Sequence, residues 1–402
     1  MTRRRLTTFA AALAAALVPL PAQAAAKQPP APTIAPPIAE TQYAPSPSAF
    51  DGDGMWIWYA SQSSGGSTSA IASRAKRSGI ETVFIKSSDG TNYWSQFNSA
   101  YVKALQAKGL DVCAWQYVYG RAPVTEARMA RRAIQAGADC VVIDAEVEYE
   151  GKYASASTYM RKLRAYAGDD YPIGLAGWPY VDYHPGYPFS VFLGPGGAQF
   201  NVPQMYWRAI GVSVDEIYAH SYLYGSLYGR PIAPLGQTYG SPKASELTRF
   251  RELAGAYGAP GVSWWSWQST SSAGWRALAR DVTPITAAQG PLPMAPTLKR
   301  GARGDMVVWA QQHLLAAGQK TSVNGIFDSR TVRAVKAFQG ASGFTKNGTL
   351  DVITWWGLLR HQPAAVRWVA RGGVRATKTG TTPEPLSARL PALKREIPPK
   401  PH

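Results

Sequence analysis

The sequence predicts an α/β fold, a (β/α)8 TIM barrel, followed by a small all-α domain of three helices. The first observation is a repeated pattern in which a helix-like stretch ends in Gly and a β-rich run follows at once, as in KRSGIETVFIK and QAGADCVVIDAE. Second, this alternation gives eight strand candidates within about 230 residues, which is the size of such a barrel. Third, a later stretch of about sixty residues has apolar residues at helical spacing, with Gly at its turns.

Strands and helices alternate along the larger region. Apolar residues three or four apart predict the helices, as in Phe97, Tyr101 and Leu105. Ser241 and Pro242 are typical of a helix cap followed by Pro at the first helical position. A doubly wound open sheet is the alternative, although no Gly-rich phosphate loop follows the first strand. The strand candidates lie near residues 54–59, 81–86, 111–117, 139–145, 172–178, 201–207, 231–237 and 260–267.

The remaining segments predict a leader, two spacers and a tail. The N-terminus has three arginines, an apolar run and small residues at Ala22-x-Ala24, the pattern of a secretory signal peptide, and the twin-arginine route stays open. Pro-rich composition predicts extended spacers and a disordered basic tail. The expected order is a signal peptide at 1–24, a linker at 25–50, the barrel at 51–282, a linker at 283–297, the helical domain at 298–360 and the tail at 361–402.

The formal net charge is +17, from 42 Lys and Arg against 25 Asp and Glu. An exported basic protein suggests an anionic partner such as a cell wall, and no nucleic-acid module accompanies the charge. After the leader, no apolar run is long enough to span a bilayer. We therefore expect a secreted monomer, extracellular or associated with the cell wall, with no integral membrane segment and no nucleic-acid partner.

The chain has two cysteines, Cys113 and Cys140, near the starts of neighbouring predicted strands. A disulfide between them is conceivable, but neighbouring parallel strands offer poor geometry, so two buried free thiols are favoured. The five histidines are scattered without ligand spacing, which disfavours a metal centre, a Ser-His-Asp triad, and a metal-dependent amidase or peptidase. We expect no metal and no cofactor.

Four carboxylates at alternate positions begin at the end of the fourth predicted strand in CVVIDAEVEYEGK: Asp144, Glu146, Glu148 and Glu150. On an extended segment, side chains two apart share a face, so Asp144 and Glu146 point the same way. Close like charges are costly, and they indicate either a solvated strand end or a catalytic pair. Because the active site of a barrel forms at the C-terminal ends of its strands, this pair is the leading catalytic candidate.

Aromatic and amide side chains gather at the same predicted strand ends. Flat aromatic faces and planar amides suit a carbohydrate, whose rings present C–H faces flanked by hydroxyl groups. Core packing is the alternative for any single tryptophan, so the interpretation depends on their coincidence at strand ends. The candidate substrate-binding residues are Lys86, Asp89, Gln116, Trp178, Gln204, Tyr206, Tyr239, Trp265 and Trp267.

Asp144-Ala145-Glu146 resembles the Asp-x-Glu that ends the fourth strand in family 25 muramidases and in family 18 chitinase-like hydrolases. FIKSSDGTNYWSQFNSAYVKALQAKGLDVCAWQYV is similar in layout to a muramidase segment, and PQMYW and GVSWWSWQ are similar to chitinase-like strand ends. The resemblance implies that Glu146 protonates the glycosidic oxygen and that Asp144 orients it and stabilises an oxazolinium-like intermediate. It also implies that Tyr206 binds the acetamido carbonyl and that the indole of Trp265 or Trp267 forms the floor of the sugar subsite.

The chain departs from both families in its other acids. Muramidases carry an Asp on the first strand, where this chain has GMWIWYAS, and chitinases have aspartates upstream of their Asp-x-Glu, where this chain has Val142 and Cys140. The candidates for the missing role are Asp89, Asp182 and Glu148.

The segment Leu298 to Leu359 resembles the type 1 peptidoglycan-binding domain, a small three-helix bundle. It departs at Asn324, where the family usually has Asp, and at Asp328, where the family usually has Gly. Members bind cell-wall glycan-peptide and commonly accompany wall hydrolases. The matching motifs include Arg303-Gly304-Asp305, Gln311, Gly325-Ile326-Phe327, Phe338-Gln339, Asn347-Gly348 and Thr354-Trp355.

These observations predict a glycoside hydrolase that cleaves a β-1,4 bond between N-acetylated amino sugars of peptidoglycan or a related polymer. The alternative is a non-catalytic wall-binding protein whose barrel has kept the sugar groove and lost the chemistry. The Asp144/Glu146 pair favours the hydrolase, and the missing acid on the first strand favours the binding protein.

Overall fold

The computed structural model describes residues 48–283 and 295–368. The predicted signal peptide, almost all of the first linker, most of the second linker and most of the basic tail lie outside these described residues. None of the helices in the described part is long and apolar enough to cross a membrane.

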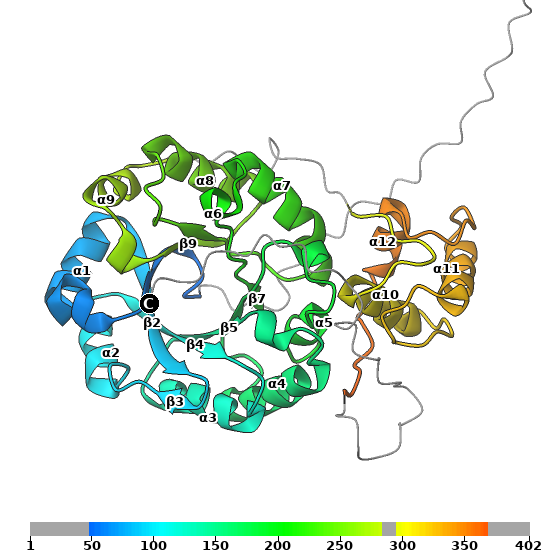
Figure 1. Ribbon diagram of the computed structural model, residues 1–402, viewed down its shortest axis with the longest axis horizontal. Helices are drawn as coiled ribbons and strands as arrows, with labels where there is room; N and C mark the ends of the chain where they lie inside the picture. The colour runs from blue at the N-terminus through cyan, green and yellow to red at the C-terminus, as the bar shows by residue number, and fades with distance from the viewer. Residues whose placement is uncertain (1–47, 284–294, 369–402) are drawn as a thin grey trace, which may run out of the picture. The chain divides into compact units, whose positions relative to one another are not determined.

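Eight parallel strands form a closed barrel, which confirms the predicted fold class (Figure 1). The sheet order is β7-β6-β5-β4-β2-β1-β9-β8, and single parallel bridges from Asn201 to Ile232 and from Gln204 to Leu235 join its two ends. The short β3 (Asn92–Tyr93) pairs antiparallel with the end of β2. The barrel strands are β1 (Gly52–Ile57), β2 (Ile80–Asp89), β4 (Asp111–Val118), β5 (Cys140–Ala145), β6 (Ile173–Ala176), β7 (Phe200–Asn201), β8 (Leu235–Gln237) and β9 (Gly261–Trp265).

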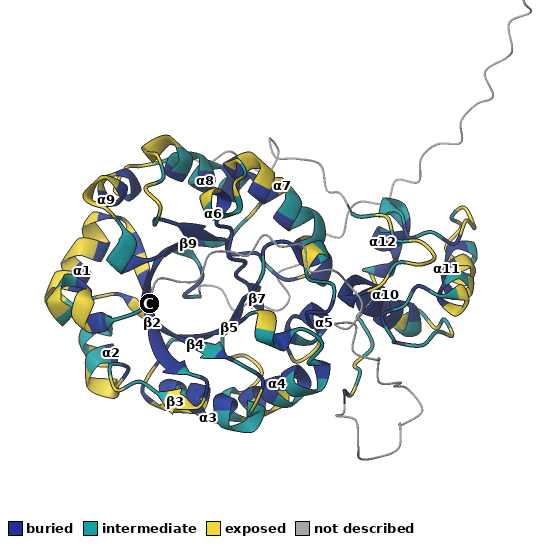
Figure 2. Cartoon of the chain, viewed as in Figure 1, coloured by how far each residue is buried: buried dark blue, intermediate teal, exposed yellow. Residues whose placement is uncertain are grey.

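Helices surround the barrel, with their exposed residues on the outer faces and a buried strand ring inside (Figure 2). The predicted cap at Ser241 is wrong, because α8 begins after Lys243, whose backbone N–H donates to Glu246 Oε2 at 2.6 Å. The carboxylate of Glu246 thus does the capping that we had expected from a serine. The helices are α1 (Thr68–Arg77), α2 (Ser99–Gln106), α3 (Pro123–Gln135), α4 (Tyr153–Ala167), α5 (Phe189–Phe192), α6 (Trp207–Ile210), α7 (Val214–Gly225), α8 (Ala244–Ala256) and α9 (Ser272–Leu278).

Side chains alternate between the barrel interior and the helix layer. On β4, Cys113 and Trp115 belong to an inner cluster, whereas Val112 and Ala114 pack in the outer cluster under the helices. Aromatic side chains dominate the interior: Trp56, Phe84, Trp115, Tyr206 and Trp265 are all at most 2% exposed. This parity decides which residues at the strand ends can reach the mouth of the barrel.

The two cysteines form a disulfide inside the barrel, so the expectation of two free thiols is wrong. Cys113 and Cys140 are direct partners in the register of β4 and β5, with their Cα atoms 4.6 Å apart. Both side chains belong to the inner cluster. On the concave face of a closed barrel neighbouring side chains converge, and this supplies the approach that a flat parallel pair lacks.

Removing this disulfide is expected to cost about 3.5 kcal/mol of unfolding free energy, from the loop-closure entropy of a 27-residue separation. We expect the Cys113→Ala/Cys140→Ala variant to unfold at lower urea concentration than the oxidised wild type by that amount. Reductant should lower the stability of the wild type and leave the variant unchanged. Equal stability of the oxidised wild type and the variant would contradict this.

A partly buried ion pair lies at the N-terminal end of the barrel, opposite to the strand ends that form the mouth. Asp53 Oδ2 lies 3.2 Å from Arg251 Nε, and the two side chains are 15% and 19% exposed. Burial raises the pKa of Asp53 to about 6, although the charge of Arg251 acts in the opposite direction. The folded protein therefore binds this proton more tightly than the unfolded chain does.

The contribution of Asp53 to stability is expected to be complete below about pH 4 and to be lost as the pH rises through 6. The raised pKa corresponds to about 3 kcal/mol between these limits. Urea unfolding of wild type and Asp53→Asn at pH 4, 5, 6 and 7 checks this. The wild type should lose stability relative to the variant with rising pH, and parallel curves would contradict the assignment.

The C-terminal region contains α10 (Asp305–Ala316), α11 (Ser329–Ala341) and α12 (Val352–Leu358). A buried glutamine closes each connection between consecutive helices. Gln311 Oε1 accepts from the backbone N–H groups of Asn324 and Gly325, and its Nε2 donates to Thr331 Oγ1 at 3.0 Å. These contacts fix the first loop from inside the bundle.

The second connection repeats this arrangement. Gln339 Oε1 accepts from Gly348 N–H at 2.9 Å, and its Nε2 donates to Thr354 Oγ1 at 3.1 Å. In both loops the Asn of an Asn-Gly pair also accepts a backbone N–H two residues on: Ile326 to Asn324, and Thr349 to Asn347. Asn324, where the family usually has Asp, therefore still supplies the hydrogen-bond acceptor that the loop needs.

Candidate active site

One glutamine bridges the two carboxylates predicted to be catalytic. Asp144 is the buried penultimate residue of β5, and the half-buried Glu146 follows the strand. Gln204, which is 4% exposed, donates from Nε2 to Asp144 Oδ1 at 3.1 Å and to Glu146 Oε1 at 2.9 Å. One side-chain amide therefore holds both carboxylates close together. Its two N–H groups also reduce the electrostatic repulsion between them.

A buried lysine on β2, two strands along the barrel from β5, lies inside a cage of tryptophans. The Nζ atom of Lys86 lies 4.4 Å from the ring centre of Trp58, 4.6 Å from that of Trp94 and 5.0 Å from that of Trp115. The same nitrogen lies 2.7 Å from Asp89 Oδ2. The cation is therefore stabilised by ring faces and a carboxylate, and the three indoles are fixed in place around it.

Two tyrosines at the mouth of the barrel donate hydrogen bonds to further carboxylates. Tyr117 donates to Glu148 Oε2 at 2.8 Å, and Tyr119 donates to Asp89 Oδ1 at 2.7 Å. Burial, the charge of Glu146 and the hydrogen bond to Glu148 all raise the pKa of Tyr117. Tyr117 thus stays protonated, bound to Glu148 and within reach of the charge of Glu146.

Of the three substitutes considered for the missing first-strand acid, Glu148 has the closest connection to Glu146, through Tyr117. Asp89 is paired with Lys86, and Asp182 binds His220 Nε2 at 2.7 Å on the loop after β6. At the end of β1 itself the chain has Trp58, one wall of the lysine cage.

Tyr206 and Tyr239 form a further wall of the mouth. Their rings meet edge to face, with centroids 5.5 Å apart. Burial, Tyr239 and the charges of Asp144 and Glu146 raise the pKa of Tyr206, so its hydroxyl is a neutral donor. Within the described residues this buried hydroxyl has no hydrogen-bond partner. A buried hydroxyl of this kind is completed by water or by a ligand atom.

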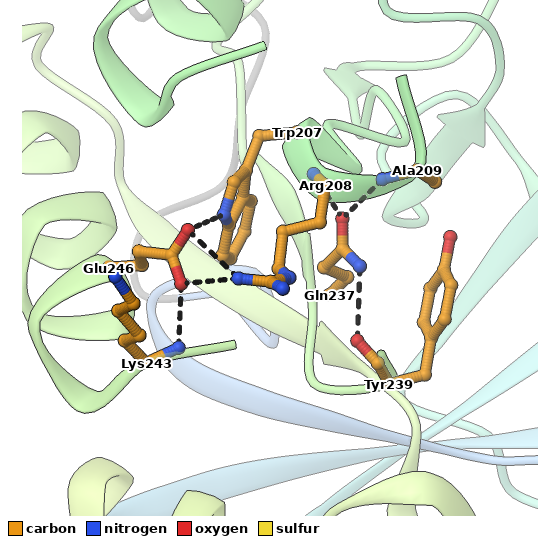
Figure 3. A network of polar contacts seen from close by, with 7 residues as sticks. All are labelled: Trp207, Arg208, Ala209, Gln237, Tyr239, Lys243 and Glu246. Carbon is orange, nitrogen blue, oxygen red and sulfur yellow. Dashed lines mark hydrogen bonds and ion pairs between the residues drawn. The ribbon is translucent and has the colours of Figure 1, made fainter. Parts of the chain in front are cut away.

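A polar network behind this wall fixes the two loops that carry the tyrosines (Figure 3). Gln237 Oε1 accepts from Arg208 N at 2.8 Å, and Gln237 Nε2 donates to the carbonyl of Tyr239 at 3.0 Å. Glu246 accepts from Trp207 Nε1 at 3.2 Å and pairs with Arg208 Nη1 at 3.0 Å. The backbone that follows β7 is thereby joined to the backbone that follows β8 and to α8.

Two of the predicted substrate-binding residues do not reach the mouth, so those predictions are wrong. Gln116 faces the helix layer and donates to the carbonyl of Glu126, because the parity that turns Trp115 inward turns Gln116 outward. Trp267 packs edge to face on Trp275 of α9, with centroids 4.8 Å apart. Strand β9 ends at Trp265 and a 3-10 turn begins at Trp267, so strand alternation no longer applies there.

The other predicted side chains lie at the mouth or just beneath it. Trp265 is 2% exposed and packs against Trp58 and Trp115, so it supports the cage from below. Trp178 follows β6 and is half-buried. Its ring stacks on that of His184, with the ring centroids 4.0 Å apart. Its indole nitrogen is buried without a hydrogen-bond partner among the described residues.

Trp94 and Trp115 are not among the residues that the sequence predicts for the site, although the rings of both face Lys86 Nζ. Trp115 points into the barrel, as does Cys113 two residues earlier on β4. Strand alternation could therefore have identified it. Trp94 follows the β2–β3 hairpin, and its position depends on a turn that no periodicity reveals. Over residues 48–283 and 295–368, no group of three or more His, Cys, Asp or Glu side chains could bind a metal ion.

Two family models match the chain. The model described as glycosyl hydrolases family 25 matches residues 62–172, which include the β5 carboxylates, and the putative peptidoglycan binding domain model matches residues 303–356. No curated protein matches the chain.

Solved structures resemble parts of the chain. A peptidoglycan-binding protein from Clostridioides difficile in complex with glutamine hydroxamate is 29% identical over 17% of this chain, with a TM-score of 0.17, and the match spans 44% of that protein. A chitinase from Chromobacterium violaceum is 12% identical over 57% of this chain and 98% of its own, with a TM-score of 0.43.

The spore cortex-lytic enzyme SleL of Bacillus cereus is 11% identical over 60% of this chain and 76% of its own, with a TM-score of 0.44. The two family matches fall on the barrel and on the three-helix region respectively. The match to glycosyl hydrolases family 25 within the barrel and the match to a putative peptidoglycan binding domain in the C-terminal region together support a peptidoglycan hydrolase.

Proposed function

We propose that the barrel cleaves the β-1,4 bond between N-acetylated amino sugars of peptidoglycan, with Glu146 as the general acid. The observation that supports this is the pair Asp144 and Glu146 bridged by Gln204 at the end of β5. A carboxylic acid beside an aromatic-lined mouth can protonate the glycosidic oxygen as the bond breaks. The small domain would concentrate the enzyme on its polymer.

Asp144 acts as the partner of Glu146 in this proposal. Its buried carboxylate would orient the substrate's N-acetyl group, whose carbonyl oxygen attacks the anomeric carbon and forms an oxazolinium ion. The negative charge of Asp144 would stabilise that cation. The hydroxyl of Tyr206, buried and without a partner among the described residues, would donate to the same acetamido group.

The protein would act outside the cell or at the wall as a monomer. This part of the proposal comes from the leader pattern of the sequence and from the peptidoglycan-binding domain. The intramolecular disulfide is consistent with an oxidising compartment.

The decisive experiment measures the release of reducing ends from purified peptidoglycan and from chitin oligomers, followed by mass analysis of the fragments. Fragments that end in N-acetylmuramic acid would assign muramidase activity, and fragments from chitin would assign the chitinase-like bond. If the protein pellets with cell walls and releases no saccharide, the barrel is a binding module and the hydrolase proposal fails.

A further inference from the structure

We propose that the loop after β6 carries a second carbohydrate subsite, centred on Tyr183, which binds another amino sugar of the same glycan strand outside the catalytic mouth. This inference rests on the proposed function, because it extends the substrate-binding surface of that same site. The ligand is an N-acetylated amino sugar ring within a polymer. The subsite lies on η4 (Val181–Tyr183) and the helix packed beside it, α7.

The first observation is the position of exposed apolar side chains. Among the described residues, the large hydrophobic side chains that are exposed are Val147, at 58%, and Tyr183, at 49%. Val147 directly follows Glu146, and Tyr183 lies on the loop after the neighbouring strand, since β6 pairs with β5 at Asp144 and Ala176. Single exposed apolar residues are common, but these two lie on adjacent loops at the catalytic end of the barrel.

The second observation is that the ring of Tyr183 is fixed by its neighbours. Tyr180 and His220 stack with centroids 3.9 Å apart, and the ring of Tyr183 meets both edge to face, at 5.2 Å and 5.4 Å. Asp182 Oδ1 lies 2.7 Å from His220 Nε2 and fixes the imidazole. A preorganised aromatic ring loses little conformational freedom when a sugar stacks on it.

The third observation is a rigid connection between this loop and the loop of Glu146. His184 stacks on Trp178, and its Nδ1 lies 3.1 Å from Glu150 Oε1. Gly151 N–H donates to the carbonyl of Gly186 at 2.8 Å. The position that a Cβ atom at Gly186 would take lies 2.5 Å from Glu150 Oε2, so the Glu150 side chain packs directly against this loop. The spacing between Tyr183 and Glu146 is therefore defined.

The chemistry of this surface matches an amino sugar. The exposed face of Tyr183 suits the C–H face of a pyranose ring, and the carboxylate of Asp182, 26% exposed, can accept from a sugar hydroxyl or an acetamido N–H. A polymer that runs from Glu146 over the exposed Val147 would reach this surface next.

The test compares wild type, Tyr183→Ala and Tyr183→Phe on peptide-free amino-sugar oligomers of increasing length. We expect Tyr183→Ala to raise KM about tenfold on long oligomers, with kcat unchanged and with no effect on the shortest oligomer that is cleaved. Tyr183→Phe keeps the ring and should behave as wild type. Equal losses at every length, or no loss at any length, would overturn the subsite.

Binding measurements separate this inference from the proposed function. Calorimetric titration of the long oligomer into Glu146→Gln, with and without Tyr183→Ala, reports the subsite without any cleavage. A weaker affinity of the double variant supports the subsite even if the wild type cleaves nothing. If wild type cleaves glycan but Tyr183→Ala loses activity only on substrates that carry peptide stems, the surface binds peptide and the sugar subsite is wrong.

Discussion

Replacing Glu146 by glutamine is expected to lower kcat/KM on peptidoglycan by about 100-fold to 10,000-fold, the usual contribution of a general acid. Glutamine has the same shape and still offers an oxygen to Gln204 Nε2, which lies 2.9 Å from the Glu146 carboxylate, so the fold should stay intact. What is lost is the proton that the leaving sugar requires. The measurement is reducing-end release with equal amounts of both proteins, together with their thermal unfolding curves.

Glu148→Gln is the matched control for this substitution. It removes one carboxylate from the same loop, two residues away, and its partner there is the hydroxyl of Tyr117. We expect it to cost less than tenfold. An equal loss in the two variants would contradict a unique role for Glu146 and would make Glu148 the second carboxylate of the reaction.

Replacing Gln204 by methionine is expected to lower kcat roughly 10-fold to 100-fold with little change in KM. Methionine fills a similar volume but cannot donate, so Asp144 and Glu146 both lose the amide between them. Hydrogen bonds to charged groups are worth about 1.5 to 3 kcal/mol, which sets the range of the loss. Gln204 is a positioning residue in this proposal, since it acts through the two acids.

The pH profile distinguishes this role from a general loss of structure. An amide donor stabilises the ionised form of each carboxyl group, so its removal should move the acid limb of kcat/KM to higher pH. Gln237→Met is the matched control, because it removes a buried amide of similar burial that contacts Arg208 N and Tyr239 O rather than the acids. An unshifted profile in Gln204→Met, or an equal shift in the control, would show that Gln204 does not position the acids.

The sequence was sufficient to predict the barrel because β-rich runs alternate with helix-like stretches at regular spacing, and some of these runs are continuously apolar, as at the start of β5. It was also sufficient to predict Asp144 and Glu146 at the end of the fourth strand, although β5 ends at Ala145, so strand alternation does not by itself fix the direction of Glu146. The amide that joins them comes from Gln204, about sixty residues later, and only closure of the barrel makes that contact.

The errors have physical causes that concern side-chain direction. The amide of Gln116 suits a sugar ligand, and this alone suggests a place in the site. Strand alternation, however, turns the Gln116 side chain toward the helix layer. Trp267 was assigned to a strand that had already ended. The cysteines were judged on the geometry of a flat sheet, whereas the curvature of a barrel brings Cys113 and Cys140 together on its concave face. The last two needed information on where a strand ends and on sheet curvature, which one-dimensional patterns do not contain.

The tryptophan cage around Lys86 also supplies a spectroscopic probe. The ring centres of Trp58, Trp94 and Trp115 lie within about 5 Å of the Lys86 ammonium group, and Trp58 and Trp94 are partly exposed to solvent. A change in local polarity on ligand binding should change both the wavelength and the intensity of tryptophan fluorescence. Intrinsic fluorescence of an inactive variant could therefore follow glycan binding in real time, without labelled sugars and without turnover.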